Sequence, residues 1–366
     1  FFKVAMIKNQ IDIAIIGGGL AGMLTAYALN KAGAKVMIIE KSASASESSW
    51  AGGGILSPLY PWRYPEAVNV LSQASQRMYP SLVDEISEIS GIDPEYRQCG
   101  MHILSDDLDS AAIQWMTDHN VIYENSQPLW RKNGGTNFVY LPEIAQIRNP
   151  RFIKSLKMAL EKSGVLFSFN NSVDRFFKDA DNCFSLLTSE GIWQAEKIVV
   201  CAGAWTSRLL GDSVLSVDIN PVRGQMLLYK APASLISSII LARGKYIIPR
   251  NDGRVLVGST MEYVGFDKSN TEEGISVLKQ FVADMCPCLA DYPIEKQWAG
   301  LRPGSPDGTP YIGEHPLMPG LYVNSGHFRN GVVMAPASAS LMCDLIQDNQ
   351  TDINPIPYSL AYSFEK

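Results

Sequence analysis

The segment that most constrains this chain is a glycine-rich run, GGGLAG at residues 17–22, which lies between two apolar stretches. The stretch before it, residues 11–16, is short and rich in isoleucine, which is typical of a buried strand. After it, apolar residues recur at helical spacing up to Gly33, where a helix is expected to stop. A second apolar run follows at residues 36–39. The pattern predicts a strand, a glycine turn, a helix and a second, parallel strand.

The glycines of this turn have separate roles in binding a dinucleotide. Gly17 allows the tight turn, Gly19 lets the backbone approach a pyrophosphate, and Gly22 lets the helix pack closely on the strand. The free N–H groups and positive dipole end of the helix would face the phosphates. Glu40, which ends the second strand, can accept hydrogen bonds from ribose hydroxyls. The alternative is a glycine turn without a ligand, but the surrounding elements favour dinucleotide binding.

Residues 13–30 carry no charge, which reaches the lower length limit of a membrane-spanning helix. Asp12 and Lys31 bracket this run, and three consecutive glycines interrupt it. We therefore expect a strand, a turn and a helix rather than a membrane span. A secretory signal is not expected, because Asp12 interrupts the apolar stretch and no small-residue cleavage site precedes it.

The composition narrows the class of protein. The chain has 366 residues, of which 46% are hydrophobic and 19% charged, so two globular domains are expected. The net charge of -6 argues against a nucleic-acid partner, since such proteins carry a basic surplus. Six cysteines are too few for a disulfide scaffold, and four histidines without a cysteine cluster predict no metal site. We expect a reduced, cytoplasmic protein.

A second small-residue loop, residues 42–54, follows Glu40 and contains the run SSWAGGG at residues 48–54. Such a loop suits backbone approach to a long, flat cofactor. It favours FAD over NAD, because a nicotinamide enzyme needs no such loop directly after the ribose acid. By composition alone, a plain flexible loop is the alternative.

The remaining periodicities indicate an α/β protein with an additional antiparallel sheet. Helices are predicted at residues 66–90, 151–163, 272–285 and 330–346, and strands at 99–104, 121–125, 192–200, 226–229, 246–249, 255–257 and 322–324. The alternation predicts a Rossmann-like FAD-binding domain interleaved with a substrate domain built on a mixed or antiparallel sheet. We assign residues 11–90, 150–222 and 301–350 to the FAD-binding domain, and residues 91–149 and 223–300 to the substrate-binding domain.

Two later segments combine glycine with arginine, WAGLRPGSPDG at residues 298–308 and GHFRNG at 326–331. Arginine presents a planar fork of donors that can grip a carboxylate through two hydrogen bonds. We expect Arg302, held in a rigid Pro/Gly turn, to orient an amino-acid substrate in this way. By residue type alone, a surface ion pair is the alternative for Arg302 and for Arg329. The second segment leads into a helix, whose N–H groups could face a flavin ring.

Taken together, these motifs resemble the D-amino-acid-oxidase-type family of FAD enzymes, most closely its glycine oxidase branch, which is linked to thiamine biosynthesis. The resemblance covers residues 11–346 in family order. Its elements are residues 17–22, Glu40, SSWAGGGILSPLYPW at 48–62, CAGAW at 201–205, PVRGQ at 221–225, VGSTME at 257–262, WAGLRPGSPDGTP at 298–310 and GHFRNG at 326–331.

The resemblance implies roles for individual residues. Arg302 would hold the substrate carboxylate together with the Tyr246 hydroxyl, Arg329 would lie close to flavin and substrate, and Met261 would line the pocket. By residue type alone, Tyr246 is a half-buried sheet aromatic and Met261 is ordinary core. The cofactor-binding residues that the resemblance implies are Gly17, Gly19, Gly22, Glu40, Lys41, Ser48, Ser49, Ala51, Gly52, Gly53, Val173 (through its backbone, at the adenine), Ala202, Gly203, Trp205, Gly326, His327, Arg329, Asn330, Gly331 and Val332.

The FAD is expected to be bound noncovalently. Sarcosine-oxidase-like members of the family attach FAD through a cysteine shortly after the counterpart of Arg302. Here Pro303 and Gly304 follow instead, and the next cysteine is Cys343. The same absence weakens a sarcosine-oxidase interpretation.

The activity implied by the resemblance is oxidative deamination of glycine or another small amine acid. A hydride from the substrate Cα would pass to the flavin, and the imine would hydrolyse to a 2-oxo acid and ammonia. Dioxygen would be reduced to hydrogen peroxide, and the imine could serve thiamine thiazole synthesis. The expected partners are a small amino acid and dioxygen, with a homo-oligomer as the assembly.

Three alternatives stay open on the sequence. One is a D-amino-acid dehydrogenase that passes electrons to a quinone. Another is an FAD-dependent enzyme that modifies a tRNA base, which the acidic charge balance disfavours. The third is a flavin-binding subunit without enzymatic activity.

Overall fold

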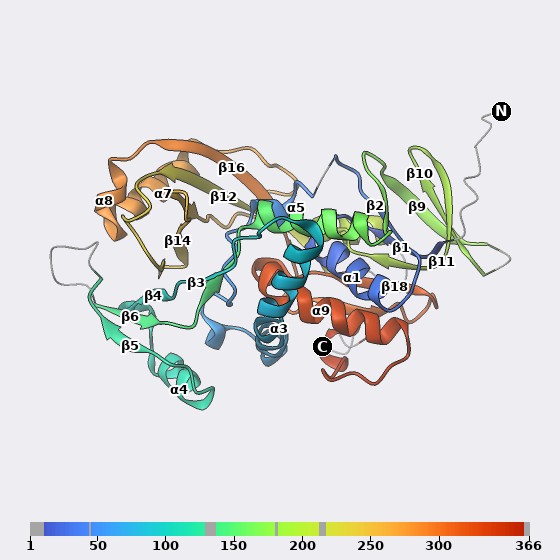
Figure 1. Ribbon diagram of the computed structural model, residues 1–366, viewed down its shortest axis with the longest axis horizontal. Helices are drawn as coiled ribbons and strands as arrows, with labels where there is room; N and C mark the ends of the chain where they lie inside the picture. Colours follow the sequence, from blue (N-terminus) through green and yellow to red (C-terminus); the bar gives the residue numbers. More distant parts are fainter. Residues whose placement is uncertain (1–10, 44, 129–136, 180–181, 212–216, 362–366) are drawn as a thin grey trace.

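A computed structural model of the chain describes residues 11–43, 45–128, 137–179, 182–211 and 217–361. Two large sheets lie at opposite ends of an elongated molecule, with the long helices packed against the sheet that contains β1 (Figure 1). The fold therefore combines an α/β layer structure with a separate sheet that is mostly antiparallel, which is the fold class that the sequence predicts.

The first sheet has the strand order β17-β18-β11-β1-β2-β8. Strand β1 pairs in parallel with β2 and with β11, as the glycine-turn pattern predicts. The antiparallel strands β9 and β10 extend from β11. The bounds are β1 (Ile11–Ile16), β2 (Val36–Ile39), β8 (Leu166–Ser168), β9 (Val173–Lys178), β10 (Phe184–Thr188), β11 (Gly191–Val200), β17 (Tyr311–Glu314) and β18 (Leu321–Ser325).

The two faces of this sheet bury different layers. Ile13 and Ile15 point to one face, where they belong to a core shared with four long helices. Ala14 and Ile16 point to the other face, where they pack with residues of β10 and α6. The helices are α1 (Leu20–Lys31), α3 (Glu66–Ser90), α5 (Asn149–Lys162), α6 (Thr206–Leu210) and α9 (Gly331–Ile346).

The second sheet has the order β16-β12-β15-β14-β13-β4-β6-β5, and all its pairs are antiparallel except β13 with β4. Ile247 and Val257 pack with helix α7 on one face, whereas Tyr246 and Ile248 point to the other face. The bounds are β4 (Met101–Leu104), β5 (Glu124–Ser126), β6 (Phe138–Leu141), β12 (Asn220–Lys230), β13 (Ile239–Ala242), β14 (Lys245–Pro249), β15 (Arg254–Gly258), β16 (Ile294–Gly304) and α7 (Glu272–Met285).

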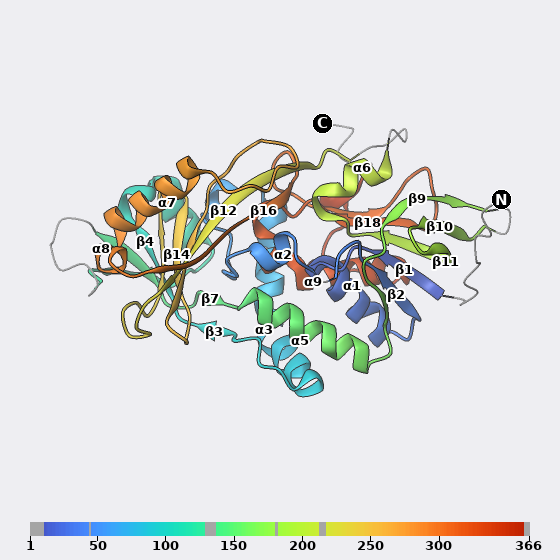
Figure 2. The same cartoon turned by 90° about the horizontal axis from the view of Figure 1, so that it is seen from above.

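The remaining elements are shorter. They are α2 (Ser48–Ala51), α4 (Ser110–Asp118), α8 (Pro287–Ala290), the two-stranded ladder β3 (Arg97–Gln98) with β7 (Ala145–Gln146), and the 3₁₀ turns η1 (Pro61–Arg63), η2 (Ser105–Asp107), η3 (Gly203–Trp205), η4 (Phe328–Asn330) and η5 (Ile356–Tyr358). The long strands β12 and β16 run side by side from the second sheet toward the first, as Figure 2 shows.

Two local predictions are wrong. Arg302 does not lie in a Pro/Gly turn but in strand β16, where it pairs with Val222, and the following Pro303 pairs with Pro221. Strand β16 is an edge strand, so a missing N–H on its outer side breaks no ladder hydrogen bond. Within the loop predicted at residues 42–54, helix α2 forms, because its short polar segment packs on the start of helix α1.

The uncharged run at residues 13–30 divides into strand β1, the glycine turn and helix α1, as the sequence predicts. Among the residues that the structure describes, no helix combines the length and the apolar character needed to cross a membrane.

We predict that His102, in strand β4, makes the stability of the fold depend on pH. Its ring nitrogens lie 2.8 Å from Ser238 Oγ and 3.1 Å from Ser126 Oγ, and burial lowers its pKa from 6.5 to about 4. Below pH 6.5 the unfolded chain binds a proton that the folded chain refuses until about pH 4, so stability falls as the pH drops through this window. Between pH 7 and pH 4.5, the free energy of unfolding measured in urea should fall less steeply for His102→Gln than for the wild type. Equal slopes would contradict the assignment.

Candidate active site

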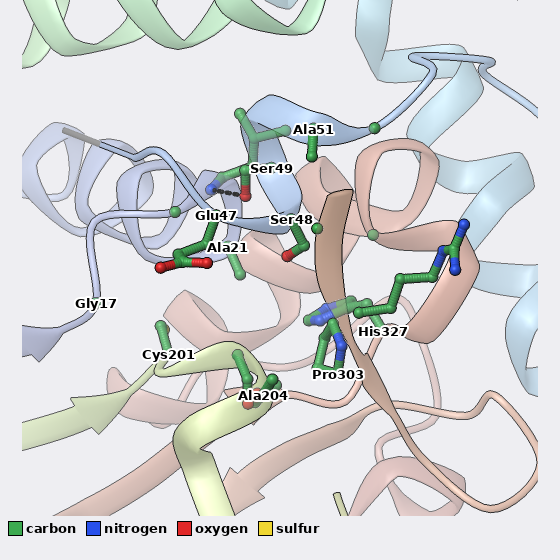
Figure 3. A pocket seen from close by; sticks show the side chains of 18 of the residues that line it. Gly17, Ala21, Glu47, Ser48, Ser49, Ala51, Cys201, Ala204, Pro303 and His327 are labelled. Atoms are coloured by element: carbon green, nitrogen blue, oxygen red, sulfur yellow. Dashed lines mark hydrogen bonds between the residues drawn. The ribbon is translucent and has the colours of Figure 1, made fainter. Parts of the chain in front are cut away.

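A single cavity of about 500 Å³ brings together residues from both sheets. Figure 3 shows Gly17 and Glu47 on one side of it and His327 and Pro303 on the other. Most of the residues predicted from the sequence line this cavity: Gly17, Gly19, Glu40, Lys41, Ser48, Ser49, Ala51, Gly52, Gly53, Val173, Ala202, Gly203, Trp205, Tyr246, Arg302, His327, Arg329, Gly331 and Val332.

Four predicted residues do not line the cavity. Gly22 lies behind the glycine turn, where a Cβ atom would collide with the carbonyl oxygen of Gly17, in keeping with its predicted packing role. Gly326 and Asn330 do not line the cavity, although the residues directly before and after each of them do. Met261, which was predicted to line the pocket, is 51% exposed and does not contribute to the cavity lining.

The glycine turn is shaped by contacts that exclude side chains. Gly17 has a φ of +113°, and a Cβ atom there would collide with the carbonyl group of Cys201 at the end of β11. Glu40 accepts a hydrogen bond from the Gly18 N–H at 2.7 Å and one from the Ser42 N–H at 2.9 Å. The carboxylate that ends β2 is therefore fixed directly beside the turn.

Helix α2 closes over the start of helix α1. The Leu20 N–H, one of the free donors at the α1 N-terminus, donates to Ser49 Oγ at 3.0 Å. Asn149 donates its side-chain N–H to the Ser49 carbonyl at 2.7 Å, which ties α2 to α5. Nearby, Lys41 lies over the Trp205 ring and 3.5 Å from Glu47 Oε1. Burial lowers the pKa of the Lys41 ammonium, although the neighbouring Glu47 opposes this effect.

Arg302 is a desolvated cation in the cavity wall. Its guanidinium donates to the carbonyl oxygens of Thr260 at 3.2 Å and Arg223 at 3.4 Å, and to the hydroxyl of Ser259. Burial lowers the pKa of the guanidinium from its ordinary value, while the nearby Tyr246 opposes this effect. Within the described chain no carboxylate pairs with it. A half-buried, desolvated cation without an anion is costly, so this position suits an anionic ligand.

Two neighbours shape the space around Arg302. A Cβ atom on Gly224, in the adjacent strand β12, would collide with the guanidinium. The Tyr246 side chain is 7% exposed, and its hydroxyl lies 3.5 Å from Met226 Sδ. Arg329, a second lining cation, donates to the Gly244 carbonyl at 3.1 Å. Arginine and phenol groups thus gather at one end of the cavity.

Arg250, which follows Tyr246 and Ile248 at alternate positions, was not predicted from the sequence. All three contact the small-residue loop: Arg250 donates to the Gly53 carbonyl at 2.7 Å. A Cβ atom on Gly53 would lie 2.8 Å from Ile248 and 3.0 Å from the Tyr246 ring. Arg250 also donates to the Ile147 carbonyl at 3.2 Å. The period-two spacing was a signal that could have identified one strand face on which the loop rests.

Comparison with known proteins places this geometry in a family. The DAO family, described as FAD dependent oxidoreductase, matches residues 12–345. This chain belongs to that family. A glycine oxidase from Pseudomonas aeruginosa is 41% identical over 357 residues, which cover 95% of this chain and 98% of the relative.

Two further similarities extend the comparison. The crystal structure of glycine oxidase from Geobacillus kaustophilus has a TM-score of 0.92 at 28% identity and covers 96% of this chain and 99% of that chain. The bifunctional protein ThiO/ThiG from Trichormus variabilis is 30% identical, and the match covers 97% of this chain and 55% of that protein. The predicted family and fold class are confirmed.

The cofactor of this oxidoreductase is FAD, as predicted, and the cavity fits it. One continuous space joins the glycine turn and Glu40 to Arg302, as a long dinucleotide requires. Backbone without side chains lines it at Gly17, Gly52 and Gly53, so that a ligand can approach closely. Helices α1 and α9 both begin at its wall, where their free N–H groups favour phosphate and other electron-rich groups.

We predict that Gly224→Ala displaces Arg302 and weakens substrate binding. Gly224 pairs with Gly300 of β16, and the preceding Arg223 is bridged to Glu262 on the other side of the strand, so the backbone is held against the guanidinium. Losing one charge-assisted hydrogen bond costs roughly 1.5–3 kcal/mol, which corresponds to an increase of about 10- to 100-fold in KM.

Gly313→Ala, in strand β17, is the matched control, because a Cβ atom there would find its nearest neighbour at an ordinary 3.8 Å. Both variants should keep their FAD. Steady-state kinetics would contradict the prediction if the KM of Gly224→Ala stayed within about twofold of the control.

Proposed function

We propose that this FAD-dependent amino-acid oxidase acts on glycine or another small amine acid, with dioxygen as the final electron acceptor. The observation that carries the proposal is the desolvated Arg302 guanidinium, which has Tyr246 beside it and no carboxylate partner among the described residues. The small carboxylate of an amino acid supplies the missing anion and accepts two hydrogen bonds from the planar fork.

Arg302 and Tyr246 orient the substrate from its carboxylate end. The guanidinium binds the two carboxylate oxygens, and the phenol donates a further hydrogen bond to one of them. When bound, FAD supplies a two-electron acceptor to which the substrate Cα transfers a hydride. The fixed carboxylate then determines which face of the Cα presents its hydrogen, which is a positioning effect.

The described lining contains no carboxylate at the arginine end of the cavity that could remove a proton. Its acidic residues are Glu40, Glu47 and Asp174, which lie on or beside first-sheet elements near the glycine turn. Burial lowers the pKa of His327 to about 4, so its ring is uncharged near neutrality. We infer that the substrate amine reacts in its neutral form, having released its proton to water, and that its lone pair assists departure of the hydride.

For glycine, the overall change consumes water and dioxygen and yields glyoxylate, ammonia and hydrogen peroxide. The imine that precedes hydrolysis could instead be transferred, which is the basis for proposing a role in thiamine thiazole synthesis. Support for this role comes from the similarity to a ThiO/ThiG protein.

Further parts of the proposal concern the cofactor and the assembly. We propose noncovalent FAD, held by the residues named in the sequence analysis, and a division of the chain at the boundaries given there. We also propose a cytoplasmic homo-oligomer. All six cysteines are free thiols, which supports a reducing compartment.

The proposal is tested by mixing the purified yellow protein anaerobically with glycine, sarcosine, D-alanine and D-proline in turn. Fast bleaching of the flavin absorbance by glycine, followed by recovery in air with peroxide formation, is expected. If only the bulkier D-amino acids bleach the flavin, the substrate is a D-amino acid and not glycine. Reoxidation by a quinone but not by air would indicate a dehydrogenase.

We predict that Arg302→Lys lowers kcat/KM by about 100-fold or more while the protein stays yellow. Lysine keeps the charge but loses the planar fork, and each charge-assisted hydrogen bond contributes roughly 1.5–3 kcal/mol. Stopped-flow reduction by glycine and the visible spectrum are the measurements. Wild-type activity in this variant would refute the carboxylate-binding role.

A further inference from the structure

His327 is a buried side chain in the cavity wall, and the inference drawn from it rests on the proposal that it binds FAD, which does not say which atom of the ring does so. It lies between the end of β18 and the start of α9, is 4% exposed and appears beside Pro303 in Figure 3. Its Nε2 is 2.7 Å from the hydroxyl of Ser338, which lies in helix α9. The hydrogen bonds beyond Ser338 determine which ring nitrogen carries the proton.

The far end of this hydrogen-bond chain is fixed by the backbone. Thr25 Oγ1 lies 2.7 Å from the carbonyl oxygen of Ala21, which can only accept, so Thr25 must donate its single hydroxyl hydrogen there. The Asn324 side chain is 3.0 Å from Thr25 Oγ1. Because the Thr25 hydrogen is already used, Asn324 must present its NH₂ group to Thr25.

This orientation fixes the remaining partners in turn. The Asn324 amide oxygen then faces Ser338, which donates its hydroxyl hydrogen to it at 3.1 Å. With that hydrogen used, Ser338 can only accept from His327, so the proton of the imidazole resides on Nε2. All members of the chain are buried, so water does not offer alternative partners.

The other ring nitrogen, Nδ1, is therefore a hydrogen-bond acceptor. Nδ1 has no hydrogen-bond partner among the described residues. It also does not belong to the buried side-chain atoms that lack both a partner and access to solvent, so it keeps some accessible surface. His327 lines the cavity, which is the open space that such an atom can reach. The acceptor thus faces the space that holds FAD.

We propose that Asn324 and Ser338 hold His327 in the tautomer whose Nδ1 accepts a hydrogen bond from an N–H or O–H group of bound FAD. His327 is the binding residue, and the other two are positioning residues. An oxidised isoalloxazine ring offers one N–H donor, at N3, and the ribityl chain offers hydroxyls. Both are neutral donors that a fixed lone pair recognises.

Two substitutions of His327 separate this role from simple packing. His327→Asn places an amide oxygen near the position of Nδ1 but loses the hydrogen bond to Ser338. His327→Gln keeps a donor for Ser338 but has no acceptor near the position of Nδ1. The dissociation constant of FAD is measured by adding FAD to each apoprotein and following the quenching of tryptophan fluorescence. We expect the Gln variant to bind FAD roughly tenfold more weakly than the Asn variant, whereas equal affinity or the reverse order would overturn the proposal.

The positioning role is tested on Ser338. Ser338→Ala removes the acceptor that fixes the tautomer and should weaken FAD binding several-fold. Ser75→Ala is the matched control, because Ser75 is also buried and its hydroxyl accepts a hydrogen bond from the Ala337 N–H of the same helix. If the two variants weaken FAD binding equally and their apoproteins melt at the same temperature, Ser338 acts only through packing, which would contradict the proposal.

A methylated cofactor identifies the donor. FAD methylated at N3 lacks the ring N–H. If that group binds His327, the methyl group weakens binding to wild-type apoprotein but adds no further loss to His327→Gln. If a ribityl hydroxyl is the donor, the effects of methylation and of His327→Gln add. Either pattern supports the acceptor role, and unchanged binding of FAD by His327→Gln excludes it.

Discussion

The antiparallel pairing of β12 with β16 is the interaction on which the rest of the structure depends. These strands are paired from Asn220 with Gly304 to Tyr229 with Ile294, and they carry Arg302 from the second sheet to the cavity. Gly224 and Gly300 face each other at one rung of this ladder. Gly224 leaves space for the guanidinium, and a Cβ atom on Gly300 would lie 2.6 Å from Ala51 of helix α2. One rung therefore accommodates both the cation and the helix that covers the glycine turn.

The electrostatic character of the cavity follows from how its cations are held. Arg302 and Arg250 are both satisfied mainly by carbonyl and side-chain oxygens that carry no charge, and burial lowers the pKa of each, to about 10 for Arg250. Neutral acceptors fix the geometry of a guanidinium without cancelling its charge. By contrast, Arg223 pairs with Glu262 and Asp267 and is neutralised locally. The unneutralised cation lies where an anionic ligand can reach it.

Local patterns in the sequence predicted much of the fold and the cofactor site. The glycine turn, Glu40 and the long helices follow from periodicity and glycine spacing, because neighbouring residues determine them. The position of Arg302 in a strand did not, because Pro303 is tolerated only where the sheet has an edge, and edges are set by distant pairing. The exposure of Met261 and the contact of Arg250 with Gly53 likewise depend on residues far away in the chain. Alternating residues can indicate a strand face, but a single sequence does not show which distant segment packs on it.

The interleaving of the two sheets also sets the order in which the protein can be completed during synthesis. Strand β11 lies beside β1 and β10, but its last residues, Ile198–Val200, pair with β18 only when residue 321 and those after it have been made. The second sheet likewise waits for β16 to cover β12. Neither sheet can complete its hydrogen bonds until most of the chain has left the ribosome. Until that point, the exposed strand edges must be tolerated or shielded from other chains. A chain cut short before strand β16 would lack both β16 and β18, so cellular quality control would meet two unfinished sheets rather than a smaller working protein.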